Sequence, residues 1–365
     1  MRVALTLEQC WHDVPGGTGV YGIELARELG RLGDVEVIGV AGRHRRPATA
    51  GFAPSAAVRA LPLAGPLLYE SWLRLGWPRV EAATGDVDVV HATSIIPAAT
   101  RRPLVVTVHD LAFLHEPAHF TRRGVDVFTR SMSIVKRRAA RVICVSQATM
   151  DDCLEHGFDA ERLRCVPNGV RPVAVAATDV AAAQARHGID CDYLLFVGTI
   201  EPRKNLGRLI EAHAALGDRV PQLVVAGAAG WGDAPANAHG ARVRFLGFVP
   251  EVDLAALYSG ATAVCYPSIR EGFGLPIVEA MAHGTPVVTS AGGATEEVAG
   301  GAAVLVDPRD VASIANGVLR AIEQRDALSS RSRERAARLT WRRAAELTRE
   351  VYREAIEDSQ RMDRR

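Results

Sequence analysis

The sequence predicts an α/β protein made of two doubly wound domains. Short runs rich in Val, Ile and Leu recur along its 365 residues, and each has the length of a strand buried in a parallel sheet. Segments with helical apolar spacing alternate with these runs, which is the order that builds parallel sheets covered by helices. The length suits two domains, which we place at residues 1–172 and 173–340, followed by a helical segment at 341–365.

Strands of the first domain are expected at five apolar runs: Arg2–Leu7, Val35–Val40, Asp88–His91, Leu104–Val108 and Val142–Val145. A loop at Glu8–Gly19 follows the first run, and a helix at Val20–Leu29 ends at Gly30. Residues 41–60 are rich in Arg, Ala and Pro, so we expect a loop there. Ser146 follows the fifth run and is expected to cap the next helix.

The first loop contains a literal GxGxxG pattern at Gly17–Gly22. In a dinucleotide-binding domain this pattern follows the strand at once, and an acid ends the second strand. Here several loop residues intervene, and Val37–Val40 continues into Ala-Gly-Arg without an acid. The pattern therefore disfavours an NAD-dependent dehydrogenase.

Two segments of the first domain each allow two interpretations. Leu61–Val80 is rich in Leu and Trp, and is either a helix packed on its own domain or an amphipathic segment that contacts a membrane or an apolar acceptor. Lys136–Arg141 is basic, and is either a solvated helix C-terminus or a site for an anionic acceptor or a lipid phosphate. We favour the structural interpretation of both.

His109 directly follows the apolar run Leu104–Val108 and precedes Asp110. It should therefore lie at the carboxyl edge of the sheet, where open α/β sheets bind ligands. This position makes His109 a candidate site residue. The next polar stretch, His115–Arg123, is a candidate acceptor loop.

Strands of the second domain are expected at Tyr193–Val197, Leu223–Ala226, Val243–Leu246, Ala261–Cys265, Thr285–Ser290 and Ala302–Val306. Arg203 and Lys204 lie after the first of these, just before a helix at Leu206–Leu216. Arginine can grip two phosphate oxygens and lysine supplies a point charge, so this pair is a candidate pyrophosphate site. After the second strand, the loop Gly227–Gly232 carries Trp231, which is a candidate for stacking on a nucleotide base.

The stretch Tyr266–Ser290 carries the strongest functional signal. A glycine-containing loop meets a helix at Pro276–His283, and a helix N-terminus favours a phosphate. Glu271 and Glu279 flank the glycines, which let backbone approach a ligand closely. Carboxylates accept hydrogen bonds from sugar hydroxyls, so the stretch predicts a sugar-phosphate site with both acids facing one crevice.

Residues Glu271–Glu279, EGFGLPIVE, resemble the signature of the retaining, nucleotide-sugar-dependent glycosyltransferases of family 4. The resemblance extends over most of the chain, and mannosyltransferases are the favoured likeness. It implies the GT-B fold, in which two Rossmann-like domains face each other across a cleft that holds the donor. It also implies that a helix at Trp341–Glu357 crosses back to the first domain.

The resemblance implies roles for single residues. Donor-binding residues are expected at Gly16, Gly17, Arg203, Lys204, Phe248, Val249, Glu271, Gly272, Phe273, Gly274, Leu275 and Glu279. Catalytic residues are expected at His109, Glu271, Arg203 and Lys204. The basic pair and the Gly274–Leu275 amides would hold the diphosphate, Glu279 the ribose and Glu271 the hexose.

Further roles concern backbone groups. The Gly16–Gly17 loop would lie beside the nucleotide sugar, the backbone near Phe248–Val249 would read the base, and the His109 carbonyl would lie near the reacting centre. Family members often carry an arginine at the position of Thr199, so Arg203 is expected to take that role here.

Composition limits the other classes of function. Lys plus Arg number 43 and Asp plus Glu 42, so a net charge of +1 disfavours a general nucleic-acid binder. Six cysteines without CxxC pairs predict a reducing compartment and no zinc site. We find no signal-peptide pattern and no apolar run long enough to span a bilayer, so we expect a cytoplasmic protein that can also work at the inner face of the membrane.

We expect neither a metal nor another cofactor at the donor site. DxD patterns occur at Asp86–Asp88 and Asp190–Asp192, but both lie where strands begin, away from the ligand-binding edge. Cationic side chains and a helix terminus would then stabilise the leaving group.

The resemblance implies transfer of a hexose to a hydroxyl of a glycan or lipid-linked acceptor in polysaccharide biosynthesis, and the likeness to mannosyltransferases favours GDP-mannose as the donor. The resemblance implies retention by attack on the same face, and the sequence shows no pair of acids placed as in retaining glycosidases. Two alternatives remain: a sugar-nucleotide epimerase of the same fold and a non-catalytic sugar-nucleotide-binding protein.

Overall fold

The computed structural model describes residues 1–228 and 242–363, and the chain forms two compact units. Unit 1 comprises Met1–Gly169 together with Trp341–Arg365, and unit 2 comprises Val170–Thr340. Trp231, predicted to stack on a base, lies outside the described residues.

Unit 1 contains a seven-stranded parallel sheet in the order β3-β2-β1-β4-β5-β6-β7. Its strands are β1 (Arg2–Thr6), β2 (Glu36–Gly42), β3 (Val58–Leu61), β4 (Val89–Ala92), β5 (Leu104–Val108), β6 (Arg141–Cys144) and β7 (Leu163–Cys165). The two outermost strands, β3 and β7, were not predicted, and β3 corrects the expected loop at residues 41–60. Both are short, and a short edge strand lacks the continuous apolar run of a buried one.

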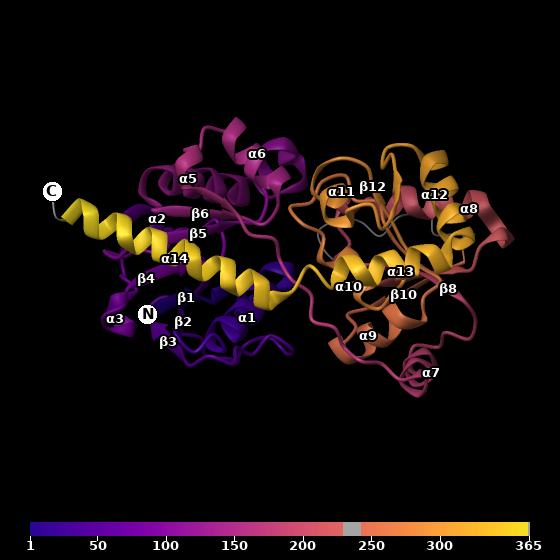
Figure 1. The fold of residues 1–365 in the computed structure, drawn as a ribbon, viewed down its shortest axis with the longest axis horizontal. Coiled ribbons are helices and arrows are strands. Elements are labelled where there is room, and N and C mark those ends of the chain that lie inside the picture. The colour runs from indigo at the N-terminus through magenta and orange to yellow at the C-terminus, as the bar shows by residue number, and fades with distance from the viewer. Residues whose placement is uncertain (229–241, 364–365) are drawn as a thin grey trace. The chain divides into compact units, whose positions relative to one another are not determined.

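The helices of unit 1 cover its sheet (Figure 1). They are η1 (Glu8–Trp11), α1 (Gly16–Gly30), α2 (Gly65–Leu75), α3 (Glu81–Thr84), α4 (Ala112–His115), η2 (Pro117–His119), α5 (Arg122–Arg138), α6 (Gln147–Glu155), η3 (Ala160–Arg162) and α14 (Trp341–Asp363). The C-terminal α14 packs on α1 and beside β4, β5 and β6. The Tyr352 hydroxyl lies 2.6 Å from His91 Nδ1 in the core, and Arg141 pairs with Glu354 and Asp358 at 3.0 and 2.5 Å. Buried and charged contacts thus anchor α14 to this unit.

Helix α1 begins at Gly16 and not at Val20, so the GxGxxG pattern is helical rather than a loop. A Cβ atom at Gly19 would lie 2.6 Å from Pro15 Cβ, and one at Gly22 would lie 3.1 Å from Leu7 Cδ2. These glycines therefore allow close packing against the chain around them. Glycine's low helix propensity explains why sequence patterning placed the start too late.

The two ambiguous segments of unit 1 both pack within that unit. On α2, Leu68 and Trp72 are buried in the core, while Leu67 is 70% exposed. At the end of α5, Arg138 donates to the Thr100 carbonyl at 3.1 Å. The described residues contain no helix whose length and apolarity would let it span a bilayer.

Unit 2 contains a six-stranded parallel sheet in the order β10-β9-β8-β11-β12-β13. Its strands are β8 (Tyr193–Val197), β9 (Gln222–Ala226), β10 (Val243–Gly247), β11 (Ala263–Tyr266), β12 (Val287–Ser290) and β13 (Val304–Val306). Its described helices are α7 (Ala177–Arg186), η4 (Pro202–Lys204), α8 (Leu206–Leu216), η5 (Gly217–Arg219), α9 (Glu251–Gly260), α10 (Leu275–Ala282), α11 (Gly293–Ala299), α12 (Val311–Glu323) and α13 (Arg325–Ala336). The apolar core lies between the sheet, α8 and α12.

Both sheets reverse their strand order at the same place. Counted within its own unit, each sheet runs third, second, first, fourth, fifth and sixth strand, and the sheet of unit 1 adds a seventh at its end. In such sheets, ligands bind at the carboxyl ends of the strands beside the reversal. The reversal lies between β1 and β4 in unit 1, and between β8 and β11 in unit 2. The loops after β8 and β11 carry Arg203, Lys204 and Glu271, so the fold brings these candidates to one edge.

Gly227, directly after β9, provides a test of how this edge is packed. A Cβ atom at Gly227 would lie 1.9 Å from the Gly198 carbonyl oxygen, where the loop after β8 starts. We expect Gly227→Ala to lower the free energy of unfolding by about 3 kcal/mol or more, because two backbone segments would have to separate. Gly207→Ala is the control, since its Cβ meets no atom within 4 Å on α8, and it should be neutral or stabilising by up to ~1 kcal/mol. Urea unfolding of both variants is monitored by circular dichroism. Equal unfolding midpoints for the two variants would contradict this packing.

Candidate active site

Asn205 fixes the loop that carries the basic pair. It has a left-handed backbone with φ of 62°, and it joins the short turn η4 to α8. Its side-chain amide donates to the carbonyls of Pro267 at 2.9 Å and Pro308 at 2.6 Å. The loop after β8 is thereby bonded to the loop after β11.

Arg203, Lys204 and Glu271 form a cluster of charged side chains at this junction. Glu271 accepts from Lys204 Nζ at 2.7 Å and from Arg203 Nη1 at 2.9 Å. Arg203 Nε also donates to Glu201 at 2.9 Å. The Tyr266 hydroxyl bonds to Lys204 Nζ and donates to Glu271 at 3.0 Å. Two cations and two carboxylates therefore balance each other in one network.

Burial makes these charges strong partners. The side chains of Glu271 and Lys204 are only 7% and 11% exposed. Burial alone would raise the pKa of Glu271, but Lys204 and Arg203 outweigh it and lower that pKa to about 2. Burial also lowers the pKa of Lys204, and the Glu271 charge opposes this effect. Glu271 is therefore ionised at neutral pH.

Glu279 lies on α10 and has a different environment. Its carboxylate accepts from the hydroxyl of Tyr258 on α9 at 2.8 Å. Burial raises the pKa of Glu279, and the Tyr258 hydrogen bond opposes this shift. The sequence pattern places Glu271 and Glu279 together, but the structure gives them separate partners.

Helix α10 starts in the same loop as Glu271. Gly274 is its N-terminal cap, with φ of 91°, and Leu275 is its first residue. A Cβ at Gly274 would lie 2.9 Å from Ile277 Cδ1, so both backbone angle and space require glycine. We had expected Pro276 to be the first helical residue, but it is the second. Gly272 and Phe273 are buried in this loop.

Phe248 and Val249 follow β10 at the same edge of unit 2. Phe248 is 63% exposed, whereas Val249 is buried. The Gly227 N–H donates to the Gly247 carbonyl at 2.8 Å, which ties the end of β9 to the end of β10. The loop that carries Phe248 and Val249 is therefore held where it leaves β10, and it presents the Phe248 ring to solvent.

His109 lies at the carboxyl end of β5 in unit 1. Its Nε2 donates to the Thr93 carbonyl at 2.9 Å, and its ring meets Tyr21 edge-on at 4.9 Å between centroids. The Thr149 hydroxyl donates to the His109 carbonyl at 3.2 Å. Burial lowers the pKa of His109, with the Thr93 hydrogen bond opposing it, so the imidazole is neutral at neutral pH with its proton on Nε2.

The other unit 1 candidates, Gly16 and Gly17, lie in the first turn of α1. They therefore form a helix start and not the loop that we expected. The DxD aspartates Asp88 and Asp192 directly precede β4 and β8, at the amino ends of these strands. Asp88 accepts from the Arg2 N–H at 2.7 Å.

Sequence reasoning missed Tyr266, Tyr258 and Glu201. Tyr266 is the last residue of β11, so its position at the ligand-binding edge was a usable signal. Tyr258 lies in the last turn of α9, and nothing local marks it as a partner of Glu279. Glu201 lies two residues before Arg203, but an acid beside an arginine is common on exposed turns.

Comparison with known proteins identifies the family. Residues 15–172 match the family model for Glycosyltransferase Family 4, and residues 182–339 match that for Glycosyl transferases group 1. The O-antigen chain mannosyltransferase B of Escherichia coli is 30% identical over 79% of this chain and 80% of its own length. The chain belongs to the family 4 glycosyltransferases. The resemblance of residues 271–279 is thus confirmed at the level of the family.

Two further known proteins are similar to this chain over nearly its whole length. A D-inositol 3-phosphate glycosyltransferase of Frankia alni is 33% identical over 96% of this chain and 97% of its own. The structure of Anabaena HepE, solved with UDP and glucose, superposes with a TM-score of 0.72 at 23% identity, over 96% of this chain and 99% of that one. This second likeness concerns the fold, which is GT-B. The chain is therefore a transferase enzyme with two Rossmann-like domains.

The acid dependence of stability tests the charge cluster. Because the pKa of Glu271 falls from 4.5 to about 2 on folding, its ion pairs stabilise the folded state fully above pH 4.5 and progressively less as the pH falls toward 2. This contribution amounts to about 3 kcal/mol at neutral pH. We expect Glu271→Gln to be destabilised relative to wild type at pH 6, and the difference to shrink at pH 3. A difference in unfolding free energy that stays constant between these pH values would contradict the ion pairs.

Proposed function

We propose that this glycosyltransferase moves a hexose, with mannose favoured, from a nucleotide-sugar donor to a hydroxyl of a glycan or lipid-linked acceptor. The observation that carries the proposal is the buried cluster of Arg203, Lys204 and Glu271 beside the strand reversal of unit 2. Buried cations at this edge suit a diphosphate, and a paired carboxylate suits sugar hydroxyls. The name of the Escherichia coli relative, O-antigen chain mannosyltransferase B, supports mannose as the sugar and an O-antigen chain as a class of acceptor.

Unit 2 would bind the donor. Arg203, Lys204 and the first turn of α10 would hold the diphosphate, because a helix start and charged donors both favour anions. Glu279 would accept from ribose hydroxyls, and Glu271 from hydroxyls of the hexose. The backbone near Phe248–Val249 would contact the base.

Unit 1 would supply His109, the start of α1 at Gly16–Gly17, and the acceptor site. The His109 ring and carbonyl are each held by a hydrogen bond, so the residue would offer a rigid surface to the sugar. Its imidazole is neutral, which suits a contact with sugar hydroxyls and leaves the diphosphate to the cations of unit 2.

The reaction would retain the configuration of the sugar. The acceptor oxygen forms a bond to the anomeric carbon on the face from which the diphosphate leaves, and the carbon–phosphate oxygen bond breaks. The acceptor proton passes to the departing phosphate. Arg203 and Lys204 stabilise the negative charge that develops there, which makes a metal at the diphosphate unnecessary.

A donor panel tests the proposed function. GDP-, UDP-, ADP- and dTDP-sugars are added to the full chain, and we expect GDP-mannose to raise the melting midpoint most, equally with and without added Mg²⁺. Lys204→Ala should weaken donor binding by roughly 1.5–3 kcal/mol, the contribution of a charged hydrogen bond. Lys136→Ala, at the chain's other lysine, is the matched control and should bind as wild type. No shift with any donor would refute a nucleotide-sugar site, and conversion of the donor without an acceptor would indicate an epimerase.

The two glutamates should separate kinetically. Glu279→Gln should weaken the free nucleoside diphosphate and the nucleotide sugar alike, which raises the donor KM when chemistry is slow. Glu271→Gln should keep or increase diphosphate affinity, because its carboxylate no longer competes for Lys204 and Arg203, but it should lower kcat because the hexose is less well held. Isothermal titration and donor kinetics measure both effects, with Glu211→Gln on the exposed face of α8 as the control. Loss of diphosphate binding in Glu271→Gln alone would reverse the assignment.

A further inference from the structure

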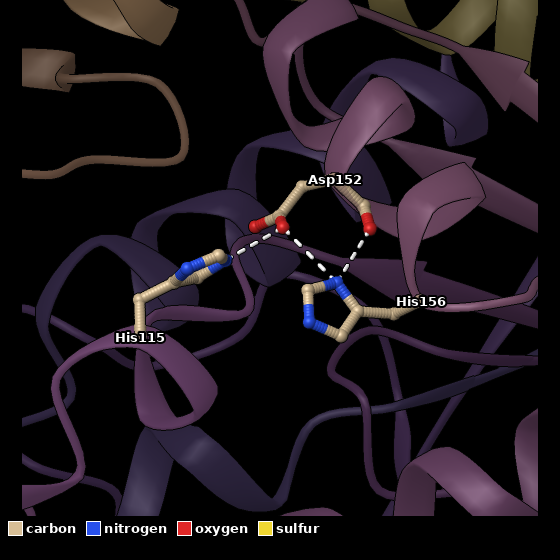
Figure 2. Close-up of side chains that lie close together, drawn as sticks. All are labelled: His115, Asp152 and His156. Carbon is tan, nitrogen blue, oxygen red and sulfur yellow. Dashed lines mark hydrogen bonds and ion pairs between the residues drawn. The ribbon is translucent and has the colours of Figure 1, made fainter.

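Three metal-ligating side chains meet in unit 1, apart from every residue assigned to the donor. His115 ends α4, Asp152 lies on α6, and His156 is the residue that follows α6. Figure 2 shows the two imidazole rings on either side of the Asp152 carboxylate. The ligand atoms of all three lie within 4.8 Å of one another.

The spacing of these atoms suits a transition metal. His115 Nε2 lies 2.7 Å and His156 Nδ1 lies 3.2 Å from the same Asp152 carboxylate oxygen. Zinc binds nitrogen and oxygen at about 2.0–2.2 Å, so the ligand atoms of a tetrahedral site lie roughly 3.3–3.5 Å apart. Asp152 and His156 are one helical turn apart and therefore share a face, and His115 comes from a different element. Small shifts of these side chains would bring their ligand atoms to the separations of a tetrahedral zinc site.

We propose that His115, Asp152 and His156 bind a divalent transition metal, with zinc as the fitting ion. Two imidazole nitrogens and one carboxylate are a common zinc ligand set, and water would complete the tetrahedron. The three side chains are only partly buried, so ion and water have access. His156 Nδ1 now donates to the Asp152 carbonyl at 2.8 Å, and binding requires the tautomer with its proton on Nε2.

The consequence of such a site is a cross-link beside His109. Helix α4 starts shortly after His109, and Thr149 of α6 donates to the His109 carbonyl. A metal held by His115 of α4 and by Asp152 would fasten both segments together. This cross-link is separate from the metal-independent diphosphate chemistry proposed for unit 2.

Zinc titration of the full chain tests the site. The exposed thiol of Cys191 is first replaced by serine, so that no surface cysteine competes. After chelator treatment, isothermal titration should show one zinc ion per chain, and zinc should raise the melting midpoint. Asp152→Asn, which keeps the side-chain volume, should weaken zinc binding by about a hundredfold or more and abolish the thermal shift, and so should His115→Ala and His156→Ala.

His187→Ala is the matched control. His187 also pairs with an aspartate, Asp253, at 3.1 Å, but no second histidine joins that pair among the described metal-ligand groups. The variant should bind zinc like the parent protein. Cobalt should bind the parent without a thiolate absorption band, because the ligands are nitrogen and oxygen. If the parent does not bind zinc, the three side chains form a hydrogen-bonded cluster only, and the proposal is overturned. Equal zinc binding by Asp152→Asn, with unchanged circular dichroism, would also overturn it.

Discussion

The ion pairs of Glu271 with Arg203 and Lys204 are the constraint on which the proposed donor-binding edge of unit 2 depends. Two buried cations without a partner would each lose their hydration, and removing one partner of a buried pair costs several kcal/mol. Glu271 supplies that partner from the second loop, and Tyr266 satisfies a further donor of Lys204. Asn205 bonds the same two loops, because its side-chain amide donates to the Pro267 carbonyl. The ion pairs therefore depend on the positions of the two loops, and the positions of the loops depend in turn on the ion pairs.

The residues of this edge are far apart in the sequence, and this explains what could be predicted. β5, β8 and α8 agree with expectation at both ends, because each apolar segment has clear polar or glycine boundaries. β3 escaped prediction because Arg59 and Ala60 are exposed on an edge strand. Their place in loops that lead into helix N-termini identified Arg203, Lys204 and Glu271 as candidates, but the Arg203–Glu271 pair spans 68 residues and follows only from the strand order.

The same limit applies to unit 1. His109 was predictable because it ends a continuous apolar strand, whereas the cluster of His115, Asp152 and His156 was not. Its ligands come from two elements that become neighbours only when β5 and β6 pair in parallel. The lack of CxxC pairs predicts no cysteine-based zinc site, but cysteine spacing carries no information about a site built from histidine and aspartate.

Environment separates two glutamates that the sequence pattern makes look alike. Cations near Glu271 lower its pKa, whereas Glu279 faces a phenol and its pKa is raised by burial. A phosphate arriving at Lys204 would compete with the Glu271 carboxylate, since both are anions that need the same donors. Among the residues that the structure describes, Glu279 instead accepts from the neutral hydroxyl of Tyr258. If the diphosphate binds as proposed, the charge cluster around Glu271 has to rearrange, whereas the proposed contact of Glu279 with ribose hydroxyls involves no competing cation pair.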